Sequence, residues 1–334
     1  METHSIGECI MNVLVVGGAG YVGGAVTDIL QAEGYSLRVY DSLLYEGSYR
    51  KPVDFCFGDL RDEKRLLPHL KWADAVVWLA AIVGDPACAL NPELAGIVNG
   101  KSLGILTESF KGRIVFTSTC SVYGAQDSVI DETAPLKPLS LYAISKLNAE
   151  KTLQDHNSII FRLGTLYGIS DTYSRIRLDL VVNTLTVRAY ANNKVIVFGG
   201  DQHRPLLHVR DAARAIVDSL KASDVGVFNL HSENMRIIEL AERLRRHFPD
   251  LIVERTDLRF QDNRTYRVSS DKARKRLGFK PKLTVDDGIE EFKLLLEQGR
   301  IRNLADRRYV NAEYLAVTLN SQPHSIDAEM PSRV

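Results

Sequence analysis

The chain has few cysteines, and their spacing excludes the common structural uses of this residue. Its 334 residues include four cysteines and no C-x-x-C pair. Such isolated cysteines fit neither a structural zinc site nor a disulfide framework. The eight histidines form no H-E-x-x-H pattern either, so we expect no metal site. The cysteines are Cys9, Cys56, Cys88 and Cys120.

The chain also lacks an excess of charge and a long apolar run. The 42 Lys and Arg residues balance 42 Asp and Glu residues, which argues against a nucleic-acid or membrane-surface partner. The longest apolar run, Ala75–Val83, is shorter than the ~18 residues of a membrane span. Residues Met1–Ile10 lack the basic start and apolar core of a signal peptide. We therefore expect a soluble, cytoplasmic protein with no membrane partner.

Apolar residues are abundant enough to build a full hydrophobic core. They make up 45% of the sequence, which excludes wholesale disorder. At about 150 residues per domain, the length corresponds to two domains or to one large domain with a lobe.

Short β-branched runs alternate with helix-length segments in the first half. The first run, Val13–Val16, is wholly apolar, as expected of a strand buried on both faces of a parallel sheet. The segment 25–33 has helical spacing and ends at Gly34. This alternation predicts an α/β fold with a Rossmann-type, doubly wound parallel sheet. Further strands are expected at 37–40, 53–57, 74–79, 113–117 and 158–162.

The pattern is less regular after Tyr167. No repeat and no Pro/Ser-rich linker separates the two halves, so a smaller C-terminal lobe should pack against the first and leave a cleft. No clear periodicity follows Asn311. We expect helices at 175–191, 211–221 and 236–248, and a strand at 195–198 followed by a Gly-Gly turn.

A glycine-rich turn follows the first strand and indicates a dinucleotide site. Gly17, Gly20 and Gly23 form a G-x-x-G-x-x-G pattern where the first helix begins. Because glycine has no side chain, the backbone can make a tight turn here. The amides at the helix N-terminus can then bind a pyrophosphate. Asp41 ends the second strand about 20 residues later, where a carboxylate binds the ribose hydroxyls of NAD and repels the 2′-phosphate of NADP. Asp59 is either an adenine ligand or a turn residue.

A tyrosine and a lysine stand four residues apart and are candidates for proton transfer. Tyr142 and Lys146 share one face of a predicted helix. The cation lowers the pKa of the phenol, which can then remove a hydroxyl proton while hydride leaves the same carbon. The run 116–124, rich in hydroxyl side chains, precedes them at a strand end, where ligands bind in parallel sheets.

Together these motifs resemble the extended short-chain dehydrogenase/reductase family, in its NAD-dependent nucleotide-sugar epimerase/dehydratase branch. The resemblance covers Asn12 to about Leu295. Its marks, in chain order, are G-G-A-G-Y-V-G (17–23), Asp41, G-D-L (58–60), L-A-A (79–81), S-T-C-S-V-Y-G (118–124), Y-A-I-S-K (142–146), R-L-G-T-L-Y-G (162–168), R-P-L-L-H-V-R-D (204–211) and L-G-F-K-P (277–281).

The resemblance implies a role for individual residues. Tyr142 is the expected acid/base, Lys146 its partner, and Thr119 the residue that hydrogen-bonds the reacting sugar hydroxyl. Asn99 matches an asparagine on the helix before that strand. Residues that match substrate-binding positions are Asn183, Arg204 and Arg264, with Thr119. Residues that match cofactor-binding positions are Gly17, Gly20, Tyr21, Val22, Gly23, Asp41, Asp59, Leu60, Leu79, Ala80, Ala81, Ser118, Tyr142 and Lys146.

Two departures from the family pattern bear on the reaction. The dehydratase branch has Asp-Glu after its catalytic Thr, whereas this chain has Cys120 and Ser121. A thiol and a hydroxyl are poor acids and bases near neutral pH, so 4,6-dehydration is disfavoured. Cys120 is either a packed residue or an unusual acid. The loop 80–88 and the run 175–183 look like a subgroup that includes epimerase-like proteins and enzymes that oxidise C4 of a GDP-heptose.

The sequence therefore predicts an NAD-dependent nucleotide-sugar 4-epimerase, and as alternatives a C4 dehydrogenase or 4-ketoreductase, a dehydratase or a non-catalytic regulatory member. The resemblance also implies a homodimer formed through two helices, one of which carries the tyrosine. We assign residues 1–10 to a flexible extension, 11–168 to the NAD-binding domain with parts of 195–235, 169–310 mainly to the substrate lobe, and 311–334 to a tail.

Overall fold

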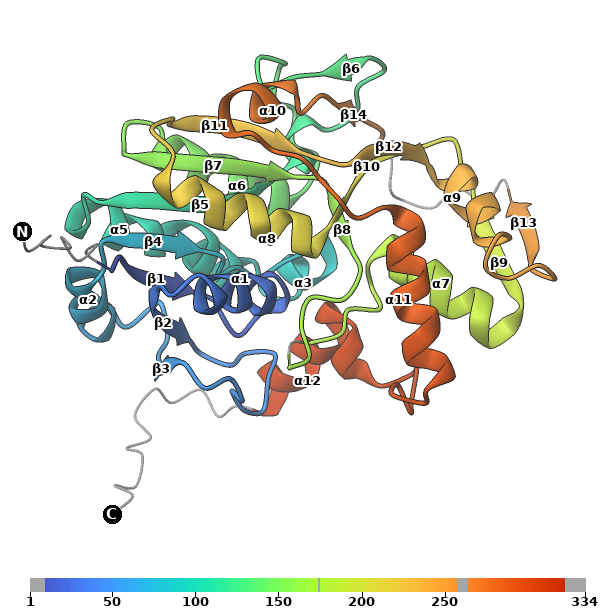
Figure 1. Ribbon diagram of the computed structural model, residues 1–334, viewed down its shortest axis with the longest axis horizontal. Helices are drawn as coiled ribbons and strands as arrows, with labels where there is room; N and C mark the ends of the chain where they lie inside the picture. Colours follow the sequence, from blue (N-terminus) through green and yellow to red (C-terminus); the bar gives the residue numbers. More distant parts are fainter. Residues whose placement is uncertain (1–9, 174, 257–263, 322–334) are drawn as a thin grey trace, which may run out of the picture.

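The computed structural model describes residues 10–173, 175–256 and 264–321. Most of the predicted extension and the end of the predicted tail therefore lie outside the described residues. Within the described part, no helix has both the length and the apolar character needed to cross a membrane. Figure 1 shows two lobes, with the larger parallel sheet in the N-terminal lobe.

The predicted parallel sheet is present and has seven strands in the described part of the chain. Its order is β11-β7-β5-β4-β1-β2-β3, and every neighbouring pair is parallel. The chain therefore starts in the middle of the sheet and winds outward in both directions, which confirms the doubly wound fold class. The strands are β1 (Asn12–Val16), β2 (Ser36–Asp41), β3 (Asp54–Phe57), β4 (Ala75–Trp78), β5 (Arg113–Thr119), β7 (Ser158–Leu163) and β11 (Gly226–Leu230).

Helices cover both faces of this sheet, and successive side chains of a strand point to opposite faces. Val13 and Val15 belong to one hydrophobic cluster, which includes α1 (Tyr21–Ala32) and α8 (Val209–Asp218). Leu14 and Val16 belong to the other, which includes the helices on the opposite face. Those helices are α2 (Glu63–Trp72), α5 (Ser102–Ser109) and α6 (Leu141–Leu153).

The C-terminal lobe is built on two small sheets and three helices, on the right of Figure 1. One sheet has the order β12-β10-β8 and the other pairs β13 with β9. The strands are β8 (Thr165–Tyr167), β9 (Lys194–Phe198), β10 (His203–His208), β12 (Glu233–Arg236) and β13 (Ile252–Thr256). The helices are α7 (Val181–Asn192), α9 (Ile237–Leu244) and α11 (Val285–Glu297).

Shorter elements complete the described part of the chain. After β4 the chain forms α3 (Asp85–Leu90), α4 (Pro92–Gly96) and a π-helical turn at Ile97–Lys101. The strands β6 (Val129–Ile130) and β14 (Arg267–Val268) pair, and α10 (Asp271–Leu277) follows. Three 3₁₀ turns lie at Cys120–Tyr123, Ser219–Lys221 and Arg307–Tyr309.

Three sequence-based expectations differ from the structure. The helix expected from residue 175 begins only at Val181, because Leu180 is extended, with φ −97° and ψ 133°. The helix expected to reach residue 248 ends at Leu244, where the chain continues in turns. Residues beyond 310, where no periodicity was found, form α12 (Asn311–Ser321), whose Leu315 is fully buried against the first lobe.

Candidate active site

A cavity of about 1370 Å³ lies between the carboxyl ends of the sheet strands and the C-terminal lobe. Its walls come from the loop β1–α1, the loop after β2, the end of β5, helix α6, the segment before α7 and the start of α12. With the exception of Asn183, every residue proposed from the sequence for the cofactor, the substrate or catalysis lines this cavity.

The glycine-rich turn has no room for a side chain at two of its glycines. Gly17 has a φ of +83°, and a Cβ there would collide with the backbone of Ala80. A Cβ at Gly23 would collide with the backbone of Gly18. The loop therefore passes close to β4 and brings the N-terminus of α1 to the cavity, an arrangement that suits a pyrophosphate.

Asp41 is held at the end of β2 by two backbone amides. Its Oδ2 accepts from Ala19 N at 3.0 Å and its Oδ1 from Leu43 N at 2.7 Å. Burial raises the pKa of this carboxyl, and the two amide hydrogen bonds act against that shift. The carboxylate thus joins the glycine-rich loop to the loop after β2, where the residues present fit a dinucleotide ribose.

Asp59 is part of the same wall, but its carboxylate is already paired. Burial acts to raise its pKa, yet hydrogen bonds from Arg61 outweigh that effect and lower it. The Arg61 Nη2 atom lies 2.7 Å from Asp59 Oδ2. The backbone oxygen of Asp59 accepts from the Tyr40 hydroxyl at 2.9 Å, which ties this turn to β2.

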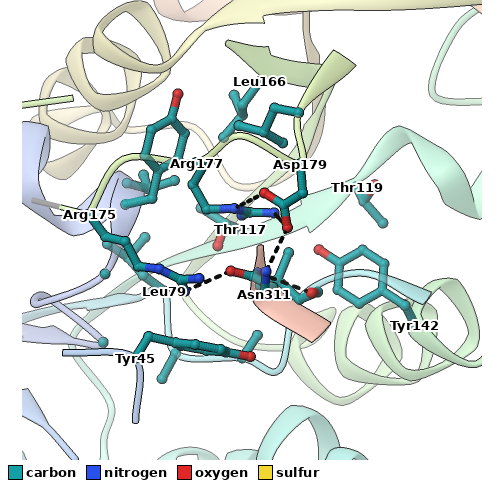
Figure 2. Close-up of a pocket in the computed structure, with 18 of the residues that line it drawn as sticks. Tyr45, Leu79, Thr117, Thr119, Tyr142, Leu166, Arg175, Arg177, Asp179 and Asn311 are labelled. Carbon is teal, nitrogen blue, oxygen red and sulfur yellow. Dashed lines mark hydrogen bonds and ion pairs between the residues drawn. The ribbon is translucent and has the colours of Figure 1, made fainter. Parts of the chain in front are cut away.

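The three candidate catalytic residues meet on one side of the cavity. Thr119 ends β5, and Tyr142 and Lys146 lie one turn apart on α6. Figure 2 shows the Tyr142 hydroxyl pointing into the space that Thr119 also faces. Thr119 is 9% exposed, and its Oγ1 donates to Ser121 Oγ at 3.1 Å.

The electrostatics of this group are dominated by burial. Burial raises the pKa of the Tyr142 phenol well above its usual value, the Cys88 thiol adds to the rise, and the Arg177 guanidinium opposes it. Burial lowers the pKa of Lys146 to about 8. The Lys146 Nζ donates to Thr117 O at 2.9 Å and lies 4.6 Å from the centre of the Phe116 ring.

Cys120 is not placed as an acid. Its side chain is fully buried, and its thiol donates to Arg162 O at 3.2 Å. Burial raises the pKa of the thiol far above its ordinary value. Ser121 lines the cavity, and its hydroxyl lies 3.2 Å from that of Tyr266. The two positions that would supply the acid and base of a dehydratase therefore hold no group that titrates near neutrality.

The side-chain amides of Asn99 and Asn183 form hydrogen bonds with backbone groups. Asn99 lies in the π-helical turn, where its amide accepts from Ile82 N at 2.8 Å and donates to Ile82 O at 3.0 Å. Asn183 is fully buried, accepts from Gly168 N at 3.0 Å and donates to Arg177 O at 2.8 Å. Both ends of the Asn183 amide therefore hold the loop between β8 and α7.

Arg204 and Arg264 line the far end of the cavity. Arg204 Nη1 donates to His203 O at 2.9 Å and to Arg264 O. Arg264 Nη1 lies 2.8 Å from Asp85 Oδ2, at the start of α3. This ion pair joins the C-terminal lobe to the first lobe across the cavity.

Sequence reasoning missed four cavity residues as site residues. Arg175, Arg177 and Asp179 lie in the irregular segment before α7 and all line the cavity, with Asn311 beside them (Figure 2). Arg177 Nε pairs with Asp179 Oδ1 at 2.7 Å, and Asp179 Oδ2 accepts from Asn311 N at 2.9 Å.

Comparison with known proteins identifies relatives over most of the chain. The family model described as NAD dependent epimerase/dehydratase family matches residues 13–230. A UDP-glucose 4-epimerase of Streptococcus mutans is 29% identical, covering 84% of this chain and 94% of its own. One from Corynebacterium glutamicum is 26% identical, covering 82% and 92%. The structure of the Thermotoga maritima UDP-glucose 4-epimerase with UDP-glucose has a TM-score of 0.76 and 25% identity, covering 87% and 100%.

Proposed function

Because the chain belongs to the NAD-dependent epimerase/dehydratase family, we propose that it is a nucleotide-sugar epimerase acting at C4 of the sugar. The observation that carries the proposal is the meeting of Tyr142, Lys146 and Thr119 on the wall of a cavity that the glycine-rich loop also lines. Relatives named UDP-glucose 4-epimerase make UDP-hexoses the first substrates to test.

The cofactor is NAD, which when bound supplies the acceptor and donor of hydride. The loop Gly17–Gly23 would hold its pyrophosphate, and the Asp41 carboxylate its adenosine ribose. The tight approach of Gly17 to Ala80 supports this fit, since a side chain there would fill the cradle. Asp41 also explains the choice of cofactor, because a fixed carboxylate repels the additional phosphate of NADP.

The chain's own residues move one proton. Tyr142, as phenolate, takes the proton of the C4 hydroxyl and returns it when the 4-keto sugar is reduced on its other face. The Lys146 ammonium stabilises the phenolate, because a nearby cation lowers a phenol pKa. The Thr119 hydroxyl holds the reacting sugar oxygen. Arg204 and Arg264 bind the substrate diphosphate, for which a guanidinium fork is well suited.

Dehydration is not part of the proposal. A 4,6-elimination needs an acid and a base next to the catalytic threonine, and Cys120 and Ser121 occupy those positions. The Cys120 thiol is buried and donates a hydrogen bond to Arg162 O, and burial raises its pKa. It therefore neither reaches the sugar nor ionises near neutrality.

The chain acts as a homodimer in this proposal. Leu139 precedes α6, Leu141 and Ile144 lie in its first turn, and their exposed fractions are 57%, 51% and 43%. Large apolar side chains grouped on one exposed face are typical of protein interfaces. Pairing this face with that of a second copy would bury them next to the helix that carries Tyr142.

The test uses the protein with whatever cofactor it retains after purification. UDP-glucose and UDP-galactose are offered separately, products are identified by NMR, and absorbance of reduced nicotinamide is followed. We expect an isomeric sugar without net cofactor reduction. Reduced cofactor accumulating with a keto sugar would instead establish a C4 dehydrogenase. No turnover would move the assignment to another nucleotide sugar or to a non-catalytic role.

The Y142F variant isolates the chemical step. Loss of the acid/base should lower the rate of epimerisation by about 10²- to 10⁴-fold. NADH binding, measured by quenching of nicotinamide fluorescence, should stay near that of the wild type. Epimerisation at the wild-type rate would remove Tyr142 from the mechanism.

A further inference from the structure

Arg175 is a buried cation without a counterion among the described residues. It is 8% exposed, forms no ion pair, and its Nη2 atom has no hydrogen-bond partner. Its other two nitrogens are used: Nε donates to Arg308 O at 2.6 Å and Nη1 to Asn311 Oδ1 at 2.7 Å. The side chain is therefore held in place, with its Nη2 amino group left without a partner.

The guanidinium lies beside the two loops that would hold a dinucleotide. Its centre is 4.6 Å from the ring of Tyr45, which follows Asp41 in the loop after β2. Two residues further on, Arg177 lies 5.9 Å from the ring of Tyr21, the residue after Gly20. Arg175 and both tyrosines line the same cavity, and Figure 2 shows the guanidinium directed into it near Leu79.

The charges around Arg175 leave it uncompensated. Burial, together with the charge of the neighbouring Arg177, lowers its pKa to about 10. Asp179, the nearby carboxylate, is occupied by Arg177 and Asn311 N. Glu46 forms no ion pair with Arg175, and burial raises the Glu46 pKa to about 7. A buried cation without a partner is costly, so a ligand anion at this point would stabilise the assembly.

We propose that Arg175 binds the pyrophosphate of the dinucleotide cofactor, opposite the N-terminus of α1. The substrate lobe and α12 would then close the cofactor groove, because Arg308 and Asn311 fix the guanidinium. A planar guanidinium suits phosphate oxygens, and the backbone amides of α1 would bind from the other side. The proposal rests on the family's cofactor and is independent of which sugar reaction the enzyme performs.

The test compares the R175Q and R188Q variants, freed of cofactor. Arg188 is an exposed arginine that lines the other end of the cavity, so R188Q removes the same charge. Dissociation constants are measured for NADH, ADP, AMP and UDP. R175Q should weaken the binding of NADH and of ADP about ten- to hundredfold, which is the range expected for the loss of one charge-assisted hydrogen bond. R175Q should weaken the binding of AMP less and leave the binding of UDP unchanged. R188Q should leave the binding of NADH unchanged.

Three results would overturn the proposal. If R175Q binds NADH like the wild type, the guanidinium does not contact the cofactor. If the binding of UDP is weakened and that of NADH is not, the Arg175 guanidinium contacts the substrate diphosphate instead. If NADH, ADP and AMP weaken equally, Arg175 only supports the fold of the groove. Should R175Q not fold, R175K keeps the charge without the fork and is expected to give a smaller loss for NADH and ADP, with AMP still least affected.

Discussion

At the scale of single residues, Lys146 is a buried cation whose proposed role carries a cost in stability. It is 2% exposed, has no carboxylate in ion-pair contact within the described residues, and donates to Thr117 O at 2.9 Å. Burial of its ammonium lowers its pKa to about 8. The folded chain therefore carries the cost of a desolvated cation at neutral pH, placed where it can stabilise a phenolate on Tyr142.

We predict that the K146M variant, without cofactor, is more stable than the wild type at pH 7. A pKa lowered from 10.5 to about 8 corresponds to about 3 kcal/mol, and the lost hydrogen bond offsets about 1 of these. Between pH 8 and 10.5 the unfolded lysine binds a proton that the folded one lacks, so wild-type stability rises with pH. The advantage of K146M should shrink over this window.

Urea unfolding from pH 7 to pH 10 measures this difference. Lys151 is an exposed lysine on the same helix, so K151M removes the same charge without a burial effect. K151M should change stability by less than about 0.5 kcal/mol. A K146M variant that is less stable than the wild type at pH 7 would contradict the prediction.

At the scale of elements, a buried ion pair joins α6 to the sheet. Glu150 lies two turns beyond Tyr142 on α6, and its Oε2 is 2.6 Å from Arg162 Nη2 on β7. Its Oε1 also accepts from Ser118 on β5. Arg162 Nη1 donates to the Tyr123 hydroxyl at 2.8 Å. This network sets the position of the helix that carries Tyr142 relative to the strand that carries Thr119.

We predict that E150Q destabilises the protein by about 3–5 kcal/mol, because it leaves the Arg162 charge buried and unpaired. The double variant E150M/R162M should lose less than the sum of the two single variants, since it removes both charges. E297Q, in an exposed pair with Lys293, should cost less than about 1 kcal/mol. Chemical denaturation measures these three variants and the single variants E150M and R162M; a loss in the double variant equal to the sum of its two single variants would show that the two charges are not coupled.

At the scale of the molecule, the C-terminal helix returns to the N-terminal lobe. Helix α12 packs against α3 and brings Asn311 to the cavity, where its Nδ2 donates to Val83 O at 3.2 Å. Ile82, Leu315 and the ring of Tyr142 share one hydrophobic cluster. The two lobes are thus joined beside Tyr142, while Leu141 and Ile144 on the same helix remain exposed.

We predict that the protein is a dimer at micromolar concentration and that the L141D/I144D variant is a monomer. Charges placed on both copies of a paired apolar face would repel and would remain desolvated. Leu294 is an equally exposed leucine, on α11, so L294D should stay dimeric. Gel filtration with light scattering measures the mass. A monomeric wild type would remove the dimer from the proposal.

The sequence by itself determined the sheet and the cofactor loop. The strand from Val13 is wholly apolar because both of its faces are covered, and this requirement is local and strong. Gly17 and Gly23 are needed because their Cβ atoms would collide with neighbouring backbone. The type and spacing of such residues reveal their role, so six of the seven strands of the large sheet were predicted to within about two residues; β11 at its edge was not predicted.

Tertiary structure alone decided the rest of the site. The sequence after Asn311 showed no clear periodicity, and α12 is placed by packing of Ala312, Leu315 and Leu319 against the first lobe, which adjacent sequence does not reveal. Arg175 meets Asn311 across 136 residues of chain. Charged side chains are placed in a cavity by the partners that compensate for their burial. Those partners are brought together only when the two lobes and α12 have folded.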